Sequence, residues 1–172
     1  MKSSTAVVLV FACIPILFLP QRMAAQQPQH QHVAAAHTDH VIDGTQHPEL
    51  VPDSAAYRLY FVTVSLSANP TDKDKKVQDA HLAKINLDPI DKQAFVTVVA
   101  NFRSQYDAWT ARWNAAATAQ GDSFDPAPFL QQRDDLVQAT RAAIGQSLSI
   151  SGVKLLDAHI QGEKKRMKVA VP

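Results

Sequence analysis

Five histidines lie close together near the N-terminus of this 172-residue chain: His30, His32, His37, His40 and His47. The first two form an H-x-H pair and the next two an H-x-x-H pair. Imidazole nitrogens are good ligands for zinc, copper and nickel, so an exported flexible segment could capture one of these metals here. Such a segment has no fixed geometry and no outer hydrogen bonds to orient its ligands, so we expect modest affinity. Histidine and glutamine also occur in linkers that bind no metal, and the sequence leaves both readings open.

The other residues that could do chemistry do not combine into a recognisable active site. Asp134 and Asp135 are adjacent, so on a helix they point about 100° apart and cannot form an acid–base pair. His81 and His159 each fall on a predicted helix without an evident partner, which is typical of ordinary surface or boundary histidines. No zinc-protease motif, glycine-rich phosphate loop or nucleophile elbow occurs in the sequence. We therefore expect no enzyme, because catalysis would need a pocket where His81 or His159 meets an acid.

The N-terminus has the pattern of a secretory signal peptide. Lys2 precedes a nearly unbroken apolar run from Ala6 to Leu19, which contains a proline and is shorter than the ~20 residues of a membrane span. Cleavage is expected after Ala24 or Ala25, which assigns residues 1–25 to the signal. The mature chain would then be periplasmic or secreted and keep no stable membrane span, with an uncleaved anchor as the alternative.

The only cysteine, Cys13, lies inside this apolar run. A lipoprotein signal places its cysteine after a small residue, which Ala12 provides, although Phe11 fits such a signal poorly. Lipidation at Cys13 is therefore an alternative to ordinary cleavage. If the signal is removed near Ala25, the mature chain has no disulfide and no thiolate metal site, and packing alone must stabilise it.

The charge balance argues against a nucleic-acid partner. The chain has 17 Lys and Arg against 16 Asp and Glu, a net charge of +1 with neutral histidines. Binding to nucleic acid needs a basic excess on one face, which this composition does not supply. The one basic run, residues 164–168, falls at the end of a predicted helix, where cations suit the helix dipole. We interpret this run as a solvated helix end.

The segment 26–47 differs from the rest in composition. It begins with glutamines and a proline and has few large apolar residues, so it cannot bury enough surface to offset the entropy of ordering. We predict that it is a disordered linker. The remaining residues, 48–172, have the size of one folded domain with a single core.

This domain is predicted to be all-α, a small antiparallel bundle of about four to five helices with one long central helix. Apolar residues at spacings of three and four, with capping residues between them, place helices near 54–66, 71–85, 89–119, 126–148 and 151–167. The long third helix carries both tryptophans. Tyr60, Val62, Val64 and Leu66 also alternate, so a strand competes with the first helix. Short connections favour antiparallel neighbours.

Two helix starts carry a family resemblance. The sequences Leu87-Asp88-Pro89-Ile90-Asp91 and Leu148-Ser149-Ile150-Ser151-Gly152 occupy places comparable to the two Leu-Thr-x-x-Gln motifs of the exported Spy/CpxP family. The overall plan also resembles that family of helical periplasmic stress proteins and, more loosely, the related heavy-metal resistance proteins. Only the leucine and a capping residue match, because Asp91 and Gly152 stand where the motif has glutamine. The resemblance implies a dimeric helical cradle that binds unfolded proteins without ATP, or a sensor partner.

Three hypotheses for function follow from these features. The first is an exported protein-interaction or chaperone-like module with an exposed apolar surface, for example on the first helix, and a protein partner or self-association. The second is a periplasmic metal-binding or metal-stress protein that uses the histidine-rich linker. The third, an enzyme, is the least favoured by the sequence.

Overall fold

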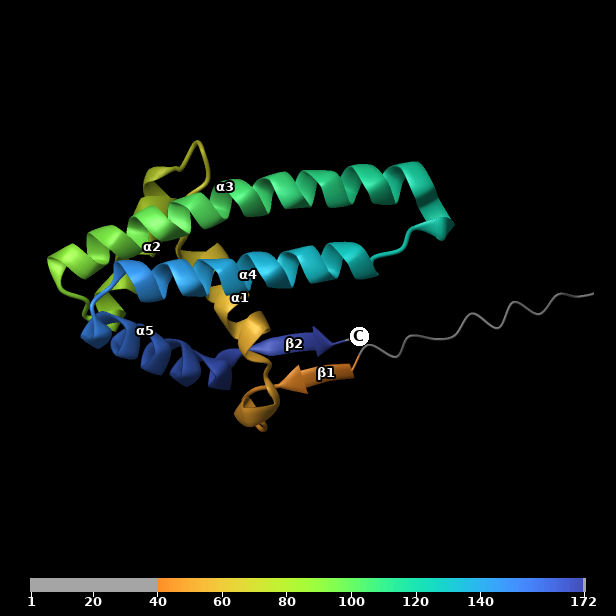
Figure 1. Cartoon of the computed structure of the whole chain (residues 1–172). Helices are drawn as coiled ribbons and strands as arrows, with labels where there is room; N and C mark the ends of the chain where they lie inside the picture. Colours follow the sequence, from red (N-terminus) through yellow and green to blue (C-terminus); the bar gives the residue numbers. More distant parts are fainter. Residues whose placement is uncertain (1–39, 172) are drawn as a thin grey trace, which may run out of the picture. The chain divides into compact units, whose positions relative to one another are not determined.

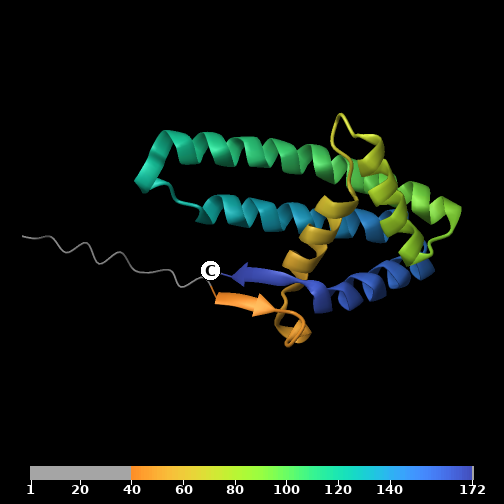
Figure 2. The same cartoon turned by 180° about the vertical axis from the view of Figure 1, so that it is seen from behind.

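The computed structural model describes residues 40–171, which form five α-helices and a two-stranded antiparallel sheet (Figures 1 and 2). The helices are α1 (Asp53–Val64), α2 (Asp72–Ile85), α3 (Pro89–Gln120), α4 (Ala127–Ser147) and α5 (Ile150–Glu163). Single turns of 3-10 helix occur at η1 (Pro48–Leu50), η2 (Gly121–Ser123) and η3 (Lys164–Arg166), and the strands are β1 (His40–Asp43) and β2 (Lys168–Val171). The predicted helical bundle with one long helix, 32 residues in α3, is confirmed. The predicted signal peptide and linker residues 26–39 lie outside the described residues.

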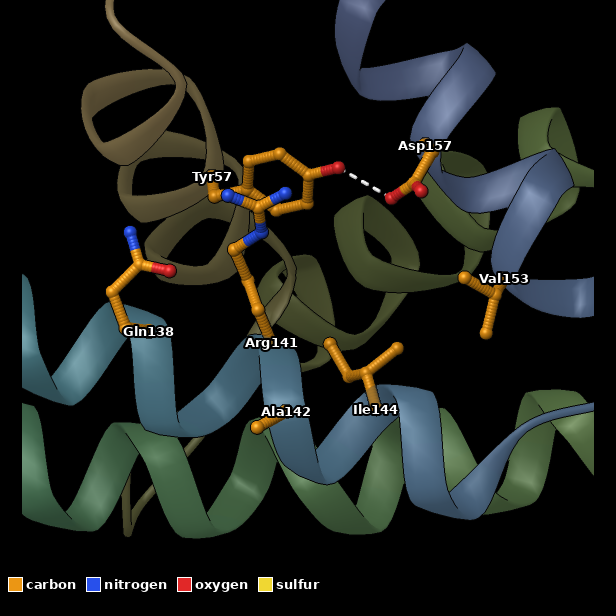
Figure 3. A pocket seen from close by; sticks show the side chains of 7 residues that line it. All are labelled: Tyr57, Gln138, Arg141, Ala142, Ile144, Val153 and Asp157. Carbon is orange, nitrogen blue, oxygen red and sulfur yellow. Dashed lines mark hydrogen bonds between the residues drawn. The ribbon is translucent and has the colours of Figure 1, made fainter.

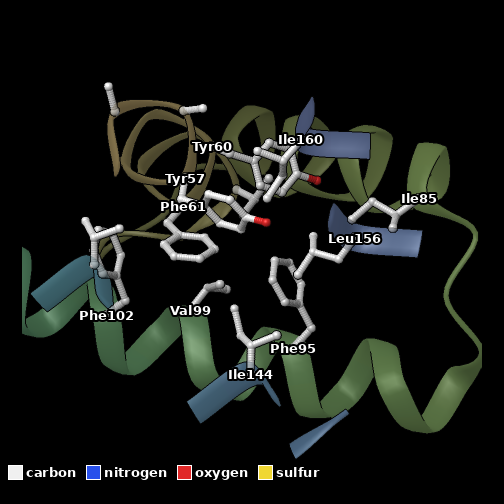
Figure 4. Close-up of a cluster of buried hydrophobic side chains, with 14 of the residues drawn as sticks. Tyr57, Tyr60, Phe61, Ile85, Phe95, Val99, Phe102, Ile144, Leu156 and Ile160 are labelled. Carbon is white, nitrogen blue, oxygen red and sulfur yellow. The ribbon is translucent and has the colours of Figure 1, made fainter. Parts of the chain in front are cut away.

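Residues Asp53–Val64 form the helix α1 and not the strand that was its alternative. This helix lies at the centre of the core. Its buried side chains face α2, α3, α4 and α5, and Figure 4 shows them meeting residues of all four. The buried members on α1 are Ala55, Ala56, Tyr57, Tyr60, Phe61 and Val64. A helix that is apolar on two faces can be covered on both only in the middle of a bundle. The apolar surface expected on the first helix is therefore inside the protein.

Local capping explains where α2 begins and ends and where α3 begins. Thr71 and Asp74 form a capping box at the start of α2, and Asn86 ends that helix in the left-handed conformation, at φ 59°. The Asp88 carboxylate accepts hydrogen bonds from the backbone N–H groups of Ile90 and Asp91 at 2.9 and 2.8 Å. Pro89 fits the first position of α3, where no backbone donor is needed.

Helices α3 and α4 form a long antiparallel hairpin, whose far half runs beyond α1 (Figures 1 and 2). A chain of aromatic rings fills this far half, with neighbouring centroids 5.0–5.8 Å apart. The chain starts in the core at Phe102, which packs on Phe61 of α1, and continues through Tyr106, Trp109, Trp113, Phe124 and Phe129. The indole N–H of Trp109 donates to the Phe129 carbonyl at 2.9 Å, which fixes the two helices in register. The aromatic side chains of the long helix, including both tryptophans, thus form a packing surface.

The two strands correct two expectations. The sequence predicts a disordered linker over residues 26–47, but within it His40–Asp43 pairs with Lys168–Val171, with Asp43 opposite Lys168. The fifth helix, expected to reach Met167, ends at Glu163 so that the chain can turn into β2. Gly44, directly after β1, allows its backbone to approach η3 closely, because a Cβ there would lie 1.9 Å from the Lys164 carbonyl oxygen. This pairing joins segments far apart in sequence, which local patterns do not reveal.

The basic run 164–168 is a solvated helix end only in part, because Lys165, Arg166 and Lys168 are exposed but Lys164 is not. Lys164 is buried, and its ammonium pairs with the Asp53 carboxylate at 2.6 Å, which also accepts from Gln161 at 3.0 Å. The hydrogen bond from Lys164 is the main cause that lowers the pKa of Asp53. Lys168, in β2, pairs with Asp43 at 3.2 Å. The run therefore joins the C-terminal segment to the start of α1 and to β1.

Candidate functional site

Helices α4 and α5 are separated only by Leu148 and Ser149 and run apart from that point (Figure 1). Two hollows lie between them and share Val153. On each helix the lining residues follow the spacing i, i+3, i+4, i+7, which places them on one continuous face. They are Gln138, Arg141, Ala142 and Gly145 on α4, and Ile150, Val153, Lys154 and Asp157 on α5. Together with Ile144, Leu148 and Tyr57, we call this surface the α4–α5 notch.

The hollow nearest the helix connection is apolar. It has a volume of about 280 Å³ and is lined by Gly145, Leu148, Ile150, Val153 and the side chain of Lys154. Ile150 is 79% exposed, although isoleucine is usually buried. Gly145 leaves the wall open, since a Cβ there would meet nothing within 4 Å. This hollow can accept one apolar side chain of a ligand.

The second hollow, of about 380 Å³, is polar at its rim (Figure 3). The Arg141 side chain rises from α4 and places its guanidinium 4.0 Å above the Tyr57 ring, a cation–π contact. The Tyr57 hydroxyl donates a hydrogen bond to Asp157 on α5. Burial, and then this bond to a carboxylate, raise the pKa of Tyr57, so the phenol keeps its proton at physiological pH. Tyr57 thus holds α1, α4 and α5 in fixed relation.

The notch has unbalanced positive charge. Arg141 and Lys154 line it, and neither forms an ion pair with any residue in the range 40–171. The single acid of the lining, Asp157, accepts from the neutral Tyr57 hydroxyl and offsets one of the two cations, so one positive charge is left in excess. A guanidinium presents five N–H donors in a planar fork that matches a carboxylate. The arrangement is suited to an anionic group beside an apolar one.

The closed end of the notch is held by a contact between two helix starts. The Asp91 carboxylate of α3 accepts hydrogen bonds from the Ser149 backbone N–H and hydroxyl. Gly152 of α5 packs against that carboxylate, because a Cβ there would lie 2.2 Å from it. Asp91 and Gly152 therefore meet in the structure, at the point from which α4 and α5 diverge.

The two domain histidines lie together at another place in the core. The Tyr60 ring of α1 contacts His81 of α2 and His159 of α5, with centroids 6.4 and 5.3 Å apart. The Tyr60 hydroxyl, His81 Nδ1 and His159 Nε2 are buried without a hydrogen-bond partner. Burial is the main cause that lowers the pKa of His159. No hydrogen bond or ion pair within the described chain joins either imidazole to an acid.

The linker histidines are only partly within the described residues. His30, His32 and His37 lie outside them, and His40 begins β1. The Nδ1 atom of His47 lies 3.2 Å from a Glu49 carboxylate oxygen, next to the single turn η1. Among residues 40–171, no three His, Cys, Asp or Glu side chains are grouped closely enough to hold a metal ion. The predicted metal site at the five histidines stays a prediction.

The notch is not among the sites that the sequence predicts. A signal was present, because α4 and α5 each carry the spacing that puts four lining residues on one face. The spacing of residues along each helix does not reveal the angle between α4 and α5. That angle decides whether the two faces pack against each other or leave a hollow between them. Gly145 and the exposed Ile150 are the two residues that hint at an unfilled face.

Comparison with known proteins finds no match: no protein-family model, no curated protein and no solved structure is significantly similar to this chain. Over the stretch that the structure describes, none of the helices has the length and hydropathy of a membrane span.

Proposed function

We propose that this chain is an exported protein-interaction module that docks an apolar segment of a partner protein in the α4–α5 notch. The observation that carries the proposal is the apolar hollow beside Ile150, which no other part of the described chain covers. Burying one Leu or Ile side chain contributes about 1.5–3 kcal/mol, enough to anchor a segment when polar contacts add to it. Export is proposed from the signal-like N-terminus.

The surroundings of the hollow favour a protein segment as the occupant. The notch is lined by an apolar wall, a planar guanidinium, a carboxylate and the Gln138 amide, which together match side chains and backbone of a peptide. The hollows, of about 380 and 280 Å³, have room for single side chains, whereas a whole helix is about 10–12 Å across, so an extended segment fits better. The proposal is one of binding without catalysis, as Tyr57 and Asp157 are engaged with each other.

Two glycines provide a matched test. Gly145 lines the hollow and Gly162 lies elsewhere on α5, and a Cβ at either position would meet nothing within 4 Å. Gly145→Leu fills the hollow with a side chain, whereas Gly162→Leu adds the same group away from the notch. Leucine has higher helix propensity than glycine, so both variants should stay folded. Loss of binding in the first variant alone would then report on the notch.

The probe is a fluorescein-labelled peptide with one leucine and one glutamate in a serine background. We expect it to bind the wild-type domain and Gly162→Leu equally, by fluorescence anisotropy, and to bind Gly145→Leu at least tenfold more weakly. Backbone amide shifts of Val153 and Lys154 in NMR spectra should move with the same titration. Equal binding to both variants, or shifts confined to other faces, would overturn the proposal.

A further inference from the structure

Arg141 lacks an acidic partner among residues 40–171, and this lack indicates what the partner segment must provide. Its guanidinium carbon lies over the Tyr57 ring, which holds the side chain in one place at the edge of the notch. A cation stacked on an aromatic ring still has its N–H donors in the plane of the fork, free to bind a carboxylate. The neighbouring Lys154 adds a second positive charge and forms no ion pair with a residue of the described range 40–171.

Helix geometry gives the separation, along the α4 axis, of the backbone positions from which the Gly145 wall and the Arg141 side chain arise. Gly145 and Arg141 are four residues apart on α4, which is about 6 Å along the helix axis at 1.5 Å per residue. In an extended chain, residues i and i+2 point to the same side and are about 6.5–7 Å apart. A segment lying along α4 can therefore place one side chain in the hollow and the next but one at Arg141.

We infer that the α4–α5 notch selects an extended segment in which an apolar side chain and a carboxylate are two residues apart. This inference rests on the proposed function and adds the chemistry of the partner. Val153 lines both hollows. The apolar stem of the acidic residue therefore packs on the same surface as the apolar side chain two residues away. A charge-assisted bidentate bond to Arg141 provides the selection against neutral and basic residues.

Four peptides of equal length and serine background test the inference. One carries leucine and glutamate at i and i+2, the second has the reverse order, the third has lysine for glutamate, and the fourth places leucine and glutamate at adjacent positions. We expect one of the first two to bind about tenfold more tightly than the lysine and adjacent peptides. The preference for glutamate over lysine should shrink as salt rises from 50 mM to 500 mM.

Variants at Arg141 show whether this residue makes the choice. Arg141→Gln removes the charge and should reduce the glutamate-to-lysine ratio to about one, while leaving the leucine contact intact. Arg141→Lys keeps a charge without the planar fork and should restore part of the ratio. Circular dichroism and the urea midpoint of each variant confirm that the domain is folded.

The outcomes separate this inference from the proposed function. If Gly145→Leu abolishes binding of every peptide but Arg141→Gln leaves the glutamate preference unchanged, the carboxylate inference is wrong and docking in the notch stands. If the adjacent peptide binds as tightly as the better i, i+2 peptide, the spacing is wrong. If none of the four peptides shifts any notch amide at millimolar concentration, both proposals fail.

Discussion

Asp91, in the first turn of α3, accepts hydrogen bonds from both the backbone N–H and the hydroxyl of Ser149, at 2.7 and 2.5 Å. In an ordinary capping box, the third residue of a helix accepts from the N–H of its own capping residue. The third residue of α5 is Gly152, which has no side chain, so Asp91 supplies that acceptor from α3. The Ser149 hydroxyl accepts from the Gly152 N–H at 3.0 Å and completes the box. One capping box is thus shared by two helices.

The shared box should stabilise the domain through the charge of Asp91. Asp91→Asn places amide hydrogens against the Ser149 donors and should lower the urea midpoint. Asp88→Asn is the control, since asparagine caps a helix as well as aspartate and Asp88 lies in the same turn. Ser149→Ala should cost about 1 kcal/mol as a lost cap. Because Asp91 and Ser149 act together, the double variant should lose less than the sum of the single losses. Strict additivity would show that the two side chains act independently.

The same carboxylate should produce a loss of stability in acid. Hydrogen bonds from Ser149 are the main cause that lowers the pKa of Asp91 below the ordinary value of 3.8. A carboxyl with a depressed folded pKa stabilises the protein above its unfolded pKa, and this contribution is lost as pH falls through the folded value. Below about pH 4, the wild type should therefore lose more stability than Asp91→Asn. Parallel curves for the two proteins would contradict this assignment.

Two glycines of α5 should respond in opposite directions to alanine. At Gly152 the new Cβ would overlap the Asp91 carboxylate, whose nearest oxygen would be 2.2 Å away, so the box must open. Such overpacking typically costs about 1–3 kcal/mol. Gly162 has open space, so Gly162→Ala should stabilise the helix by about 0.5–1 kcal/mol. Urea unfolding monitored by circular dichroism measures both. A stabilised Gly152→Ala would mean that Asp91 can move without loss.

A second pH effect should come from His159 at a higher pH. Burial is the main cause that lowers its pKa. Glu163 acts in the opposite direction, and Lys84, His81 and Arg166 add to the lowering. Protonation of His159 is less favourable in the folded state than in the unfolded chain. The free energy of unfolding should therefore fall as the pH drops below 6.5, the ordinary pKa of histidine. His159→Phe removes this group and keeps a ring beside Tyr60, so its stability should be flatter between pH 7 and 5. An equally steep decline in the variant would exclude His159 as the cause.

The predicted metal site can be tested with a control that respects the fold. A truncation at His47 would remove β1, whose partner is β2, so it would damage the sheet as well as the histidines. Replacing His30, His32 and His37 by alanine leaves both strands intact. We expect Ni²⁺ to bind the chain from Gln26 with modest affinity in calorimetry, and this heat to vanish in the triple variant. Unchanged binding would move the site elsewhere, and no binding to either protein would end the metal hypothesis.

The positions of the helices could be predicted because their signals are local. Thr71 with Asp74, and Asp88 with Pro89, satisfy the first backbone donors of their helices without any help from distant residues. The apolar spacing of three and four then carries each helix to its end. These features depend on residues within one turn of each other, and a linear sequence shows them directly.

The pairing of β1 with β2, the shared box and the notch depended on the tertiary structure. His40 pairs with Val171 across almost the whole domain, and Asp91 meets Ser149 58 residues later. Neither contact produces a periodic pattern in the sequence, since each joins single residues from two segments that are far apart along the chain. The notch depends on the angle at which α5 leaves α4, which is decided by what packs beneath both helices. The sequence alone therefore determined which segments are helical, and the packing of those helices decided which of their faces stayed open.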